Sequence, residues 1–153
     1  MGIALLLHAL AAVVWVGGMF FAYVVLRPVA AGQLEPPQRL ALWVGVFGKF
    51  FPWVFAAIGI LLVTGFWMVL GFYGGFGAVG PYVHTMLWLG IVMMMLFMHV
   101  FFASFKRLKL AVAAEDWALG AKKLAQIRLL IAINLALGVC VIAIASGGRY
   151  LLQ

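Results

Sequence analysis

Long apolar segments without a charged residue dominate the pattern of this chain. Each of these segments has about 20 residues or more, which is enough for a helix to cross a hydrocarbon layer of roughly 30 Å. They are continuously apolar and do not alternate, so the pattern predicts helices and not the strands of a β-barrel. The uncharged segments are residues 3–26, 50–73, 81–105 and 129–148.

The pattern therefore predicts an all-α fold, an integral membrane four-helix bundle. One transmembrane domain is expected to cover residues 1–153. Residues 40–49 are predicted to form an amphipathic segment at the membrane interface, which places Pro52 in the first turn of the second span. The predicted spans are residues 3–27, 50–73, 82–106 and 128–150, each to within about 2 residues.

Composition agrees with a membrane protein and excludes other classes. Hydrophobic residues make up 69% of the chain and charged residues 8%, which is far from the composition of a soluble globular domain. Cys140 is the only cysteine, so an internal disulfide or a site with several thiolates is excluded. The lipid bilayer is thus the expected environment.

Nine of the ten basic residues lie in two of the three predicted connections, and the tenth, Arg149, lies near the C-terminus. This distribution indicates the topology. Basic residues concentrate in cytoplasmic loops, so both basic connections are expected in the cytoplasm and both termini on the outer, periplasmic side. The net charge of +7 is explained by this asymmetry and requires no nucleic-acid partner. The two connections contain Arg27, Arg39 and Lys49, and Lys106, Arg107, Lys109, Lys122, Lys123 and Arg128.

Three histidines lie in or beside the spans, where an ionisable residue indicates function. At 1.5 Å per helical residue, His8 lies about 28 Å from the cytoplasmic edge and His84 about 33 Å. His99 lies only about 10 Å from that edge. His8 and His84 are therefore predicted to share the outer half of the membrane, with His99 deeper.

Helical periodicity predicts which residues share a face. His99 is expected to point into the bundle because it lies on one face of the third span with other polar or aromatic residues. In the first span His8 shares a face with small residues, which would leave open volume beside a nitrogen ligand. The first face contains His84, Trp88, Met95, His99, Phe102 and Lys106, and the second His8, Ala11, Ala12, Trp15, Met19 and Ala22.

Each of these residues also has a purely structural interpretation. His99 and His8 could hydrogen-bond to a neighbouring helix, and His84 could be an ordinary interfacial residue. The methionines at 93–95 can be lipid-facing or gap-filling residues. Lys49 and Arg128 can act as anchors that extend toward the interface.

Two stretches resemble a known family. The segment "LHALAAVVWVGGMFF" places a histidine before Trp-x-Gly-Gly, and "GPYVHTMLWLGIVMMMLFMHVFFASFKRLK" contains His84 and His99 before the basic arm. Together they resemble the four-helix CopD (copper resistance D) proteins. More distantly, the chain is similar to HemJ, the membrane protoporphyrinogen oxidase, in which a first-span histidine matches His8.

The resemblance to HemJ implies a b-type haem protein active in redox chemistry or electron transfer, related to porphyrin or haem. A b-type haem requires one or two neutral imidazoles and a slot between helices. His8 is the expected axial ligand, with His84 as its partner. Trp15 could pack on the macrocycle and Arg149 could pair with a propionate. His99 could ligate a second haem.

The resemblance to CopD implies the alternative, copper uptake or copper resistance in the bacterial inner (cytoplasmic) membrane. Copper(I) prefers imidazole and thioether ligands. In this interpretation the expected partner is a periplasmic copper carrier. The haem interpretation instead implies a redox partner, whose identity is unknown. Whether the protein is an enzyme, such as a haem-dependent oxidoreductase, and whether it forms a homo-oligomer both stay open. The candidate copper ligands are His8, His84, His99, Met19, Met95 and Met98.

Overall fold

The computed structural model describes the backbone of residues 1–151 and the side chains of residues 1–148, and this part of the chain is helical without a strand. Four long helical segments are each long and apolar enough to cross a membrane. The predictions of an all-α bundle and a multi-pass membrane protein are confirmed. The segments are α1 (Gly2–Phe20) with α2 (Arg27–Gln33), α3 (Pro36–Trp67), α4 (Pro81–His99) with α5 (Lys106–Ala113), and α6 (Trp117–Leu151).

Three short π-helical stretches lie inside or at the end of these segments. Phe21–Leu26 joins α1 to α2, and Val100–Phe105 joins α4 to α5, so each pair forms one continuous helical rod. Met68–Phe72 extends α3 before the loop that leads to α4. Each π-helical turn shifts the register of the faces that follow it.

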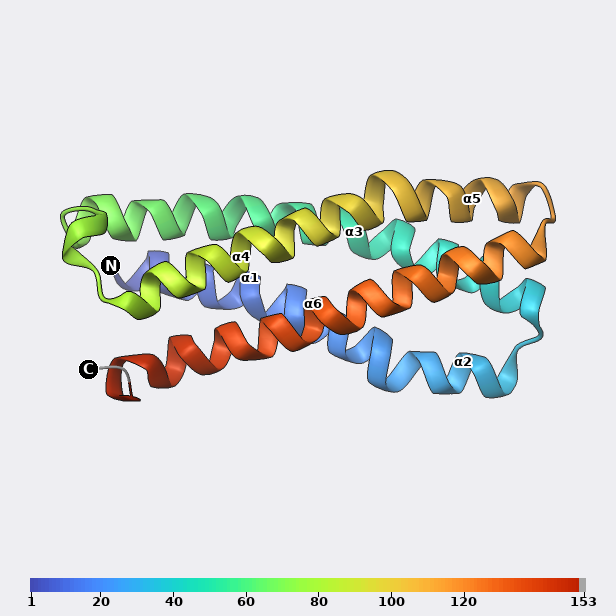
Figure 1. The fold of residues 1–153 in the computed structure, drawn as a ribbon, viewed down its shortest axis with the longest axis horizontal. Coiled ribbons are helices and arrows are strands. Elements are labelled where there is room, and N and C mark those ends of the chain that lie inside the picture. The colour runs from blue at the N-terminus through green and yellow to red at the C-terminus, as the bar shows by residue number, and fades with distance from the viewer. Residues whose placement is uncertain (152–153) are drawn as a thin grey trace.

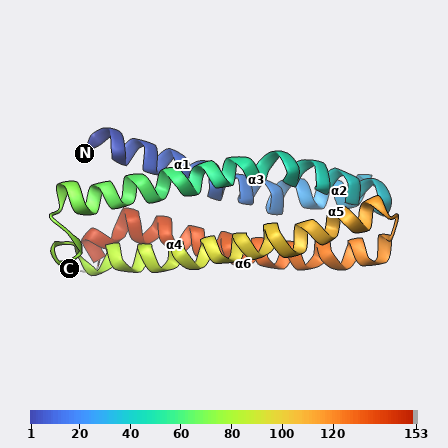
Figure 2. The same ribbon diagram turned by 90° about the horizontal axis from the view of Figure 1, so that it is seen from above.

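The bundle has two layers and two distinct ends. Figure 2 shows α1, α2 and α3 in one layer and α4, α5 and α6 in the other. The N-terminus, the loop between α3 and α4 and the C-terminal part of α6 lie together at what we call the terminal end (Figure 1). The turns between α2 and α3 and between α5 and α6 lie at the opposite end, which we call the basic end.

Prolines and one aspartate define where the helices begin. Pro36 and Pro81 occupy the first helical position of α3 and α4, where no backbone donor is needed. Asp116 Oδ1 accepts a 2.9 Å hydrogen bond from the Leu119 backbone N–H and satisfies a free donor in the first turn of α6.

The predicted interfacial segment at 40–49 is wrong. These residues belong to α3, which runs unbroken from Pro36 to Trp67 with Pro52 inside it. Trp43 is only 2% exposed and Phe47 only 1%, so their rings lie in the core between the layers. Aromatic packing across the bundle therefore decides the course of this segment.

Phenylalanines connect the two layers. Phe51 on α3 lies 5.3 Å from Phe97 on α4, measured between ring centroids, and the two rings meet edge to face. Phe55 makes a similar contact with Phe101 at 4.9 Å. Such aromatic pairs contribute about 0.5–1.5 kcal/mol beyond area burial. Inside a membrane, where lipid is as apolar as the core, packing of this kind holds helices together.

Gly138 allows three helices to approach closely. A Cβ atom at Gly138 of α6 would lie 2.8 Å from a Val16 methyl on α1 and 3.2 Å from the Met93 methyl on α4. A small residue at a crossing point of this kind is typical of membrane bundles. The crossing lies one helical turn from Asn134 and so positions that side chain against α1 and α4.

Candidate functional site

The inward face of α1 carries the candidate ligands. Met19 and Trp15 are each 3% exposed, and His8 at the terminal end of the same face is half-buried. His8 and Met19 are separated by three helical turns, or roughly 16 Å along the axis. Met19 lies roughly 12 Å from Arg27, near the middle of the hydrocarbon layer.

A hydrogen bond to α3 sets the orientation of His8. His8 Nδ1 lies 2.8 Å from Thr64 Oγ1, and Thr64 Oγ1 lies 2.6 Å from the Ile60 carbonyl oxygen. A carbonyl can only accept, so the single Thr64 hydroxyl hydrogen is donated to Ile60. Thr64 must therefore accept a hydrogen from His8 Nδ1. In the neutral imidazole this leaves Nε2 with a free lone pair, which is the form that binds metals.

Sequence analysis missed Thr64 as part of this site. Thr64 is 7% exposed and is the only serine or threonine in the uncharged segment 50–73. That isolation in an apolar segment was the signal that could have identified it. Gly65 lies next to it, and a Cβ atom there would be 3.4 Å from His8 Cε1, so the ring packs against the α3 backbone.

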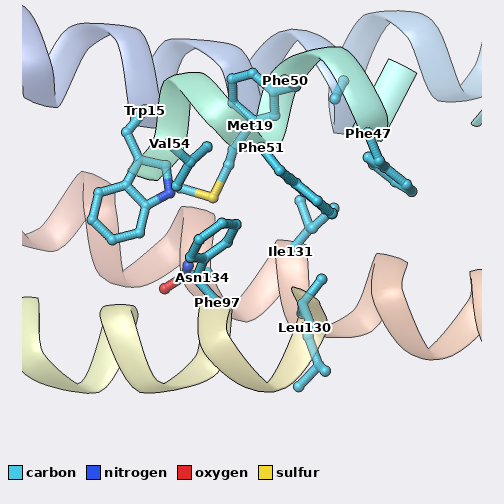
Figure 3. Close-up of a pocket in the computed structure, with 12 residues that line it drawn as sticks. Trp15, Met19, Phe47, Phe50, Phe51, Val54, Phe97, Leu130, Ile131 and Asn134 are labelled. Atoms are coloured by element: carbon cyan, nitrogen blue, oxygen red, sulfur yellow. The ribbon is translucent and has the colours of Figure 1, made fainter. Parts of the chain in front are cut away.

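A small cavity lies farther along the same face. Trp15 and Met19 from α1 and Asn134 from α6 line it together with phenylalanines of α3 and α4 (Figure 3). Its free volume is about 20 Å³, which is room for about one water molecule. The cavity is thus a narrow, mostly apolar space with one thioether and one amide.

Asn134 is the strongest polar feature of the cavity. It is 4% exposed, and its Nδ2 donates a 3.3 Å hydrogen bond to the Met93 carbonyl oxygen. Its Oδ1 is buried and has no hydrogen-bond partner among residues 1–148. An unsatisfied buried acceptor costs about 1–3 kcal/mol. That cost marks Oδ1 as a group available to a water molecule or a cation.

His84 and His8 have different hydrogen-bond partners. The Nε2 of His84 donates a 3.1 Å hydrogen bond to the Phe76 carbonyl oxygen in the loop between α3 and α4. His8 lies on the seam of α1 and α3, whereas His84 begins α4 in the other layer (Figure 2). Each imidazole has its own partner, and no contact between the two rings is described.

The predicted inward orientation of His99 is wrong. His99 is exposed, and its neighbours on that face, Trp88 and Met95, are 67% and 59% exposed. The inward face of this segment instead carries Met93 and Phe97, which are 3% and 4% exposed. All faces of this span are apolar, so the position of a polar residue does not identify the inward face. The packing of the phenylalanines against α3 determines which face of the span points inward.

Trp15 and Arg149 are the other two residues that were predicted to contact a haem. Trp15 packs edge to face on Phe97 with a ring-centroid distance of 6.3 Å. The Arg149 side chain lies outside the described residues. Among the described residues, no three His, Cys, Asp or Glu side chains come together as a metal site. Any metal bound here would thus depend on thioether, amide or exogenous ligands beside His8.

The free volume of the cavity can be compared with the volume that a porphyrin needs. The cavity beside Trp15 and Met19 has a free volume of about 20 Å³, whereas ligand pockets for larger molecules measure roughly 300–1,000 Å³. The packed bundle therefore contains no porphyrin-sized slot at this cavity. Haem ligation by His8 stays a prediction.

Comparison with known proteins gives one match. The sequence profile of the family described as copper resistance protein D (CopD) matches residues 44–147. No curated protein and no solved structure matches the chain significantly. The match covers α3 from Val44 through most of α6, which includes Thr64 and Asn134 but not His8.

Proposed function

The chain belongs to the family of copper resistance protein D, and on that premise we propose that it binds and passes Cu(I) within the bacterial inner membrane. Copper is here the substrate. The proposal places the terminal end of the bundle on the periplasmic side, because the basic residues at the other end favour the cytoplasm. A periplasmic copper carrier is the partner expected to deliver the ion.

The observation that carries this proposal is the hydrogen bond between His8 and Thr64. It holds Nδ1 as the donor and leaves Nε2 with a free lone pair at the terminal end of the bundle. A neutral imidazole oriented through its other nitrogen is the usual state of a histidine ligand. We assign His8 as the first ligand that Cu(I) meets.

Met19 and Asn134 provide the next polar position on the path. The Met19 thioether is a soft ligand for Cu(I), and Asn134 Oδ1 is an acceptor without a partner at the same cavity. Trp15 lies between His8 and Met19 on α1, and an indole face attracts cations. The cavity has room for about one water molecule, so passage of an ion requires the helices to move.

Cu(I) binding to the purified protein tests the proposal. Wild type, His8→Ala and His99→Ala would be titrated with Cu(I) under reducing, anaerobic conditions against a chromogenic chelator. We expect His8→Ala to lose about tenfold or more in affinity, the loss typical even of residues that only orient a ligand. His99→Ala is the matched control, because it removes an exposed imidazole and should bind as wild type does.

The same samples separate copper from haem. An absorption spectrum of wild type purified after growth with ample haem would show a Soret band if haem is bound. A Soret band that His8→Ala loses would replace the copper proposal with haem ligation. Equal Cu(I) affinity of wild type and His8→Ala, without a Soret band, would contradict both roles for His8.

A further inference from the structure

A second pocket, at the basic end, brings together arginines that are far apart in the sequence. Arg27 from the start of α2 and Arg128 from α6 line it, and both are half-buried. Tyr23 and Trp43 form its aromatic walls. This pocket shares only Ala22, Phe47 and Ile131 with the cavity beside Met19, and it has no part in the proposed copper path.

The two charged side chains that line this pocket, Arg27 and Arg128, are both positive. Arg27 and Arg39 both repel the guanidinium of Arg128. The chain has only three acidic residues, Glu35, Glu115 and Asp116, and all three are exposed. No acidic side chain lines the pocket. Half-buried like charges without a counterion are costly, so this arrangement requires an anion from outside the chain.

The depth of the pocket indicates which anion. Arg27 is the first charged residue after the uncharged segment 3–26, and Arg128 directly precedes the uncharged segment 129–148. Both arginines therefore lie where the hydrocarbon layer ends, at the level of the lipid phosphates. Tyr23 is a residue typical of this level.

The chemistry of arginine matches a phosphate group. A guanidinium presents its N–H groups as a fork that fits two phosphate oxygens, whereas an ammonium acts as a point charge. Arg27 lies over the Tyr23 ring, with 4.8 Å between its guanidinium carbon and the ring centroid. Stacking of this kind fixes the plane of the guanidinium and leaves its N–H edge free.

We propose that Arg27 and Arg128 form a binding site for the headgroup phosphate of an anionic phospholipid in the cytoplasmic leaflet. The lipid would join the layer of α1, α2 and α3 to α6 at a pocket that no acidic side chain lines. This site differs from a diffuse attraction of the basic end, because Arg27 on α2 and Arg128 on α6 line one pocket.

Lipid-dependent stability of the full-length protein tests this site. Wild type, Arg128→Gln and Lys122→Gln in uncharged detergent would be heated with phosphatidylglycerol, phosphatidylcholine or inorganic phosphate at matched concentrations. We expect phosphatidylglycerol alone to raise the Tm of wild type. Arg128→Gln should weaken the apparent lipid affinity by about tenfold, the loss expected for one charge-assisted contact. Lys122→Gln removes the same charge from an exposed position of α6 and should respond as wild type.

Three outcomes would overturn the site. An equal loss of lipid affinity in Arg128→Gln and Lys122→Gln would mean diffuse attraction. Equal stabilisation by phosphatidylcholine and phosphatidylglycerol would mean that binding does not depend on the headgroup charge. A Tm rise with inorganic phosphate alone would mean a soluble anion. Arg128→Lys keeps the charge but loses the fork, so we expect an intermediate response. That variant keeps the test decisive if Arg128→Gln does not fold.

Discussion

Thr64 on α3 accepts the Nδ1 hydrogen of His8 on α1 across 2.8 Å. The two residues are 56 positions apart in the sequence, and the contact both joins two helices and selects the histidine tautomer. Hydrogen bonds between membrane helices contribute about 0.6 kcal/mol on average. The contact therefore matters more for the chemistry of His8 than for the stability of the bundle.

Replacing the acceptor should weaken copper binding more than it weakens the fold. In Thr64→Val the shape is kept and the oxygen is lost, so Nδ1 has no acceptor and Nε2 is no longer fixed as the free nitrogen. We expect Cu(I) affinity to fall about 10–100-fold, as for other partners that orient a ligand. Chelator competition measures the affinity, and thermal unfolding measures the stability.

Thr64→Ser keeps the oxygen and should retain most of the affinity. Thr85→Val removes a hydroxyl that donates to the Pro81 carbonyl on the exposed side of α4, and it should leave copper binding unchanged. If Thr64→Val and Thr85→Val bind copper equally well, the orienting role of Thr64 is wrong.

Gly138→Ala should destabilise the bundle. The added methyl group would lie 2.8 Å from Val16 and 3.2 Å from Met93, and overpacking of this kind costs about 1–3 kcal/mol. Gly90→Ala is the matched control, because a Cβ atom at Gly90 meets nothing within 4 Å. The Tm of each variant in the same detergent decides the comparison, and a larger drop for Gly90→Ala would contradict the packing of α6.

His99→Ala should leave stability near that of wild type, whereas Phe97→Ala should lower it strongly. His99 is exposed, while Phe97 is 4% exposed and contacts Trp15, Phe51 and Phe55. Truncating a buried phenylalanine costs about 3–5 kcal/mol. Thermal unfolding of the two variants provides the measurement. A greater loss for His99→Ala would restore an inward position for His99.

The orientation of the bundle can be measured with single cysteines. In a Cys140→Ser background, Ala78→Cys lies in the loop at the terminal end and Ala114→Cys in the turn at the basic end, and both positions are exposed. A membrane-impermeant maleimide should label Ala78→Cys in intact spheroplasts, because the basic end is expected in the cytoplasm. Ala114→Cys should react only after the membrane is opened. The reverse labelling pattern would invert the bundle and the direction of the proposed copper path.

The four long helices, and the position of the basic residues at one end of the bundle, could be predicted from the sequence because both depend on local chemistry. A charged side chain is costly in hydrocarbon wherever the rest of the chain lies. The uncharged segments, such as 3–26, therefore predict membrane spans by themselves. The small residues around His8 correctly indicated an inward face on α1, where Ala11 and Ala22 are buried beside Trp15 and Met19.

Only the tertiary structure decided which faces of the other helices meet. Lipid and protein interior are equally apolar, so periodicity in the third span carried no signal, and His99 was assigned to the wrong face. The interior was chosen by shape, through the fit of Phe97 against α3 and the gap that Gly138 provides. The pairs His8–Thr64 and Arg27–Arg128 likewise exist only because distant segments cross there, and no local pattern encodes such a crossing.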